Sequence, residues 1–122
     1  MLLNFTNHPY AQWGGAQRRA AAQYGAVRDF PFPNVPPALD EAGLDQMADQ
    51  YAEALLNAHP SAVLCQGEAA LAFRIICRLQ QHGIPVLAAS TERISHERPL
   101  PDGSAERRAV FVFCRFRRYD SP

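Results

Sequence analysis

The feature that most constrains the fold of this chain is the alternation of short apolar segments with longer helical ones. Four segments have the length and composition of buried strands, at residues 1–5, 26–32, 61–67 and 84–90. Three segments with helix-favouring composition or helical spacing of apolar residues separate them, at residues 15–25, 44–58 and 68–83. This alternation predicts a mostly parallel sheet with helices on both faces.

The C-terminal part of the chain predicts one more strand. The turn-forming run PDGS at 101–104 precedes a partly alternating apolar segment at 110–116, which indicates an antiparallel edge strand reached through a hairpin. The alternation would place Val110, Val112, Cys114 and Phe116 on one face, and Phe111 and Phe113 on the other. Right-handed crossovers then give a single Rossmann-like three-layer α/β domain over residues 1–122, with strand order 2-1-3-4 and the antiparallel strand at the edge.

Composition excludes several classes of protein. The 12 basic residues, all arginines, balance 12 acidic ones, so we expect no partner in the form of long nucleic acid. Cys65, Cys77 and Cys114 share no short spacing, which favours free thiols over disulfides or a zinc site. No signal peptide or membrane-spanning segment is evident. We therefore expect a cytoplasmic protein with no metal, no cofactor and no membrane contact.

Polar residues follow three of the predicted strands where each strand ends. In a parallel sheet these ends meet at one edge, and ligands bind there at the point where the strand order reverses, here between the first and third strands. The predicted ligand-binding residues are Thr6, Asn7, Gln66, Gly67, Glu68, Ser90, Thr91 and Glu92. His8 is the candidate for proton transfer, and Arg93 the candidate for stabilising an anionic transition state.

Each cluster also has a structural interpretation that the sequence leaves open. Asn7 and His8 are placed to cap the helix that follows. Gly67 allows a tight turn with positive φ, or lets a ligand approach the backbone, and Glu68 suits the beginning of a helix. Arg93 has Glu92 as a neighbouring ion-pair partner. The apolar loop FPFPNVPP at 30–37 would pack over the sheet edge or against a second copy, or else form a wall of the site.

The layout resembles a minimal CRISPR-associated Rossmann-fold (CARF-like) domain. The polar residue that closes the first strand of such domains matches Asn7 or His8, and their small polar cluster after the fourth strand matches Ser90 and Thr91. The chain also resembles small bacterial proteins with the stretches LNFTNHP, DFPFPNVPP, QGE and STER. The first resemblance implies a homodimer that binds a cyclic oligoadenylate at the switch-point edge in antiviral defence, and ring nucleases of this type cleave the ring.

Two hypotheses from different classes follow. In the first, a cytoplasmic homodimer binds a nucleotide-like anion, most directly a cyclic oligoadenylate, and the ribose 2′-OH attacks the adjacent phosphate without a metal. In the second, the domain is a non-catalytic module that holds a metabolite or a partner protein. The sequence leaves open whether the protein is an enzyme.

Overall fold

Five strands form the sheet of the computed structural model, which describes residues 1–120, and their order is β2-β1-β3-β4-β5. The strands are β1 (Leu2–Phe5), β2 (Val27–Asp29), β3 (Ala62–Cys65), β4 (Val86–Pro99) and β5 (Ala105–Arg118). The first four are parallel, and β5 pairs antiparallel with β4 at the edge. The predicted fold class and strand order are confirmed.

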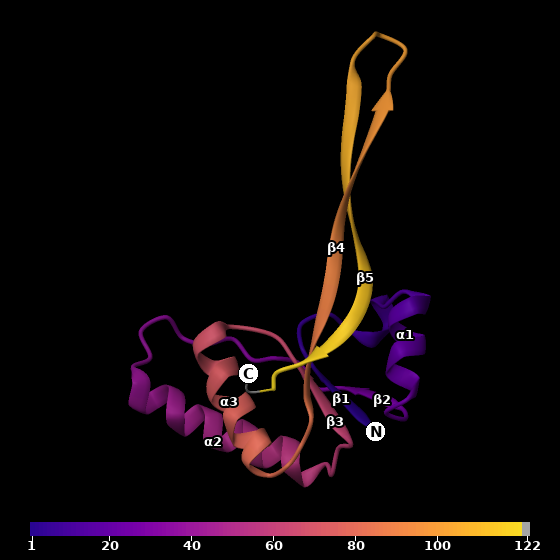
Figure 1. Ribbon diagram of the computed structural model, residues 1–122. Helices are drawn as coiled ribbons and strands as arrows, with labels where there is room; N and C mark the ends of the chain where they lie inside the picture. Colours follow the sequence, from indigo (N-terminus) through magenta and orange to yellow (C-terminus); the bar gives the residue numbers. More distant parts are fainter. Residues whose placement is uncertain (121–122) are drawn as a thin grey trace.

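Three helices cover the two faces of this sheet. They are α1 (Gly15–Ala22), α2 (Glu41–Asn57) and α3 (Ala69–Gln81), and a short 3₁₀ turn, η1 (Tyr10–Gln12), precedes α1. The helix α1 lies on one face, and α2 and α3 lie together on the other (Figure 1). No helix among the described residues is both long and apolar enough to cross a membrane.

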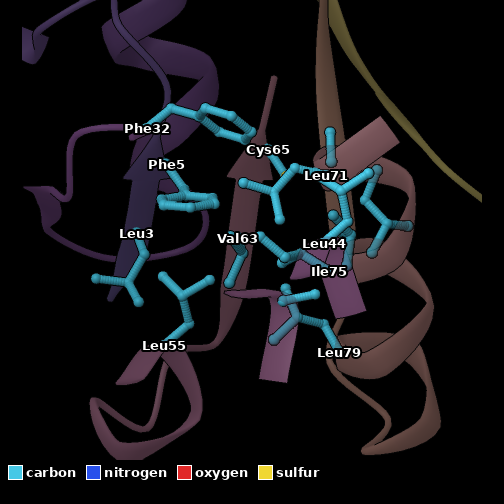
Figure 2. Close-up of a cluster of buried hydrophobic side chains, with 14 residues drawn as sticks. Leu3, Phe5, Phe32, Leu44, Leu55, Val63, Cys65, Leu71, Ile75 and Leu79 are labelled. Atoms are coloured by element: carbon cyan, nitrogen blue, oxygen red, sulfur yellow. The ribbon is translucent and has the colours of Figure 1, made fainter. Parts of the chain in front are cut away.

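The core has one apolar cluster on each side of the sheet. Leu3, Phe5 and Val63 point toward α2 and α3, where they meet Leu55 and Ile75 (Figure 2). A smaller cluster beneath α1 contains Leu2, Leu64, Leu87, Trp13 and Ala21. Because successive strand residues face opposite sides and both sides are covered, all four residues of β1 and of β3 are buried.

The loop at 30–37 belongs to the core. Phe32 is buried, and its ring centroid lies 4.8 Å from that of Phe5, while Phe30 makes an edge-on contact with Phe5 at 5.5 Å. Both rings pack in the cluster on the α2 side. Of the alternatives for this loop, packing over the sheet is therefore confirmed.

The last two strands are longer than the sequence indicates. Each has 14 residues, and their pairing continues to Pro99 and Ala105, so they form a ribbon about 45 Å long at roughly 3.3 Å per residue. The outer part of this ribbon projects away from the body of the protein (Figure 1). We call residues 92–112 the arm. Residues 90–93, expected to project from a strand end, lie within β4.

A β-bulge changes which residues of β5 share a face. Ser90 pairs with Arg115, but Thr91 pairs with Phe113, so Cys114 is an extra residue in β5. As a result Phe113 and Phe116 lie on the same face, with ring centroids 5.0 Å apart. The expectation that Phe116 shares a face with Val110 and Val112 is wrong, because simple alternation does not anticipate the inserted residue.

Candidate functional site

A cavity of about 800 Å³ lies where β1 and β3 end, on the α1 side of the sheet. We call it the strand-end cavity. Its walls come from the loop after β1, the first turn of α1, the turn after β3 and the base of the β4–β5 ribbon. Of the predicted site residues, the structure brings six together here: Thr6, Asn7, His8, Gln66, Gly67 and Thr91. The cavity lies at the predicted reversal of strand order, between β1 and β3.

The loop after β1 is held by a buried amide that sequence reasoning missed. Asn4 is 1% exposed, and its Nδ2 donates to Asp29 Oδ1 at 2.8 Å and to the carbonyl of His8 at 2.9 Å. Its Oδ1 accepts from the Thr6 hydroxyl at 2.8 Å, and the Thr6 Oγ1 accepts from the His8 amide at 3.1 Å. The sequence did contain a signal for this network: an asparagine stands inside an apolar strand, and a buried amide needs hydrogen-bond partners. Thr6 is therefore a positioning residue.

Further contacts hold the segment that leads into α1. The amide of Tyr10 donates to Asp29 Oδ1 at 3.1 Å, and the Trp13 indole Nε1 donates to the His8 carbonyl at 3.0 Å. The Arg18 guanidinium donates to three carbonyls between Tyr10 and Trp13 and lies over the Tyr10 ring. The backbone around Asn7 and His8 is thus fixed, while both side chains remain exposed.

The first turn of α1 presents amide groups to the cavity. Gly14 is the N-cap residue and has no side chain to accept from these amides, and Gly14, Gly15 and Ala16 are all exposed and line the cavity. The first N–H groups of a helix lack partners within the helix and carry a partial positive charge. Among the described residues that line the cavity, none is acidic. The cavity can therefore accept an anion at this turn.

Aromatic side chains form another wall of the cavity, with Trp13 before α1 and with Phe111 and Phe113 on β5. Trp13 is buried and contacts Phe116, which in turn contacts Phe113. Phe111 lies next on the same face of the ribbon and is 68% exposed. The rings of this row are tilted against one another by 56° and 62°, so the exposed Phe111 ring is the surface on which a nucleobase would stack.

The Gln66 side chain is hydrogen-bonded to the backbone of β4. Its Oε1 accepts from the amide of Ala89 at 3.1 Å, and its Nε2 donates to the Ala89 carbonyl at 3.4 Å. These two hydrogen bonds join β3 to β4 beyond the last backbone pair, Leu64 with Leu87. Gln66 therefore shapes the cavity floor rather than offering free hydrogen-bonding groups.

Glu68 does not line the cavity, because it caps its own helix. Its carboxylate accepts from the amides of Ala70 and Leu71 at 2.9 and 2.8 Å, at the N-terminus of α3. These two backbone hydrogen bonds lower the pKa of the Glu68 carboxyl. The structural interpretation of this residue holds, and an anion cannot use the same amides. The available helix N-terminus is that of α1.

The remaining predicted residues lie along β4 and do not line the cavity. Ser90 lies at the bulge, opposite Arg115, and Glu92 pairs with Val112 on the face opposite to Thr91. Arg93 pairs with Phe111, two residues further out than Thr91. Arg93 thus does not join His8 in lining the cavity, because β4 continues into the arm instead of ending at Ser90.

Position 67 is a glycine because the Phe32 ring leaves no room for a side chain there, and not because the backbone needs a positive φ. Its φ is not among the positive values, and a Cβ built at this position would overlap the buried Phe32 ring. The expected positive φ is therefore wrong. Gly67→Ala should lower the free energy of unfolding by about 1–3 kcal/mol, because the ring must shift within a packed core.

Chemical denaturation followed by circular dichroism measures this loss. Gly15→Ala is the matched control, since a Cβ there meets only the flexible end of Arg19 in a helical position, and its stability should be unchanged or slightly higher. Equal stabilities of the Gly67→Ala variant and the wild type would contradict the assigned role of Gly67.

The fold and cavity together define a small, doubly wound α/β domain with a candidate ligand site at its topological switch point. The chain belongs to the Uncharacterized protein MJ1673 family, whose model matches residues 1–117. Neither the curated proteins nor the solved structures contain a match to this chain.

Proposed function

We propose that the strand-end cavity binds a nucleotide-like anion, and that a cyclic oligoadenylate is its ligand. The observation that carries this proposal is the meeting, in one cavity, of an uncapped helix N-terminus with an exposed aromatic wall. The first suits a phosphate and the second a nucleobase. The resemblance of the layout to CARF-like domains suggests the cyclic ligand.

The polar groups of the cavity support recognition of a base or ribose. The side chains of Asn7, Gln12 and Thr91 line the cavity and are exposed. Amides and hydroxyls both donate and accept, so they can pair with base edges and with ribose hydroxyls. At about 800 Å³ the cavity lies in the upper part of the range of roughly 300–1,000 Å³ for small-molecule sites, which favours a ligand of several groups.

Cleavage of the bound ring would follow from in-line attack by a ribose 2′-oxygen. That oxygen bonds to the adjacent phosphorus, the bond from phosphorus to the 5′-oxygen breaks, and the products are a 2′,3′-cyclic phosphate and a 5′-hydroxyl. His8 accepts the proton of the 2′-hydroxyl while water protonates the leaving 5′-oxygen, or protonated His8 donates to that oxygen while water accepts the proton of the 2′-hydroxyl. We assign stabilisation of the phosphorane charge to the α1 amides in place of Arg93, which does not line the cavity.

We propose the cytoplasm as the location of the protein. Its three cysteines are free, and Cys114 is exposed at the bulge. An exposed thiol persists in a reducing compartment. Cys65, by contrast, is buried, and burial raises the pKa of its thiol to about 12.

Calorimetric titration with cyclic oligoadenylates of several ring sizes, and with linear oligoadenylate, tests the binding proposal. We expect heat with at least one cyclic ligand, and an affinity about 10-fold lower or more for Phe111→Ala, since stacking on an aromatic ring contributes about 1–3 kcal/mol per base.

Phe73→Ala is the matched control for Phe111→Ala. Phe73 is 67% exposed on α3 and does not line the strand-end cavity, so its removal should leave the affinity unchanged. No heat with any nucleotide would overturn the proposal and favour a non-catalytic module for a metabolite or a protein partner.

A further inference from the structure

The arm exposes apolar side chains on both faces and has no second layer along most of its length. Phe111 is 68% exposed, and Val110 and Val112 are 43% and 41% exposed. A two-stranded ribbon alone is marginally stable in water. Such exposed apolar residues on a projecting element are typical of a protein interface.

We propose that the arm packs against the arm of a second copy of this chain. The contact uses the face that carries the Ile94–Val110 pair, flanked by Glu92–Val112 on one side and His96–Arg108 on the other. Phe111 lies on the opposite face, toward the strand-end cavity, and Val112, at the inner end of the proposed contact, also borders the cavity. The central Ile94–Val110 pair and the outer His96–Arg108 pair do not border the cavity, so the proposal does not rest on the proposed ligand.

The charge pattern on this face is self-complementary. A two-fold axis through the Ile94–Val110 pair runs the two arms antiparallel and places each Glu92 opposite the His96–Arg108 pair of the other copy. Two identical acid–base contacts then flank an apolar centre, as an isologous interface requires. Arg108 now contacts Glu106 of its own strand at 3.2 Å, but both side chains are exposed, so this ion pair contributes little and can exchange.

The total charge of the arm favours a second copy over a nucleic acid. Its acidic residues are Glu92, Glu97, Asp102 and Glu106, and its basic residues are Arg93, Arg98, Arg107 and Arg108. These charges cancel, so two arms approach without net repulsion. A phosphate backbone would instead require an excess of positive charge.

Sedimentation equilibrium of the full chain tests the proposal. We expect a dimer for the wild type and a monomer for Val110→Asp, with an unchanged circular dichroism spectrum. Phe73→Asp is the matched control, because Phe73 is as exposed as Phe111 but lies on α3, and this variant should remain a dimer. A monomeric wild type, a dimeric Val110→Asp or a monomeric Phe73→Asp would overturn the proposal.

Charge reversal tests the two-fold arrangement without removing apolar area. Glu92→Arg should weaken dimerisation about 10-fold, because it places like charges opposite each other. The double variant Glu92→Arg/Arg108→Glu should recover most of the lost affinity, since the pair is then restored with opposite polarity. A double variant no tighter than the single one would overturn the arrangement.

Discussion

His8→Ala should slow cleavage of a bound cyclic oligoadenylate about 100-fold or more, while its affinity for the ring changes little. General acid–base catalysis by a positioned side chain contributes roughly 10²–10⁴ in rate. The His8 imidazole is exposed at the cavity, and its backbone is fixed by donors from Asn4 and Trp13 to its carbonyl. Alanine removes the imidazole but retains those backbone contacts, so the shape of the loop should persist.

Single-turnover cleavage, with products separated by chromatography, measures this rate, and calorimetry measures the affinity. His82→Ala is the matched control, because His82 is exposed at the C-terminus of α3 and does not line the cavity, so its removal should not affect the rate. Equal rates for His8→Ala and wild type would remove His8 from the mechanism. If the wild type binds the ring without cleaving it, the cleavage mechanism is wrong and only the binding proposal stands.

Asn4→Leu should lower the free energy of unfolding by about 3 kcal/mol, which corresponds to a fall in Tm of about 10 °C. Leucine has a similar size, so the cavity term is small. The cost arises because the Thr6 hydroxyl, the Asp29 carboxylate and the His8 carbonyl each lose a hydrogen-bond partner. The buried Thr6 hydroxyl is then left with only a long contact to the His8 carbonyl, at 3.4 Å, and the other two groups each have one donor fewer.

Urea unfolding followed by circular dichroism measures the loss of stability. Asn34→Leu is the control, since Asn34 is exposed in the loop after β2, and its stability should stay within about 0.5 kcal/mol of the wild type. An Asn4→Leu variant as stable as the wild type would show that the Asn4 network does not hold the loop.

The sheet order could be predicted from the sequence because the pattern of short apolar strands and helices leaves few topologies. The residues around the cavity could be predicted only in part. Thr6, Asn7 and His8 follow a strand that is buried on both faces, so the change from apolar to polar residues marks the end of that strand in the sequence. The length of the arm was not visible, because residues 91–98 are mostly polar and their ladder is made by backbone groups.

Two roles depend on contacts that spacing does not reveal. Glu68 caps α3, and whether a carboxylate turns toward its own helix or toward a ligand depends on the local backbone. The bulge at Cys114 depends on the register of β4 against β5, and a one-residue shift there moves Phe116 to the other face.

Hydrogen–deuterium exchange with and without a saturating cyclic oligoadenylate tests most directly whether the strand-end cavity holds the ligand. Our account predicts slower exchange in peptides that cover residues 14–18, where the first-turn amides of α1 would bind a phosphate, and around Phe111. Slower exchange confined to α3 around Phe73, or none anywhere, would contradict it.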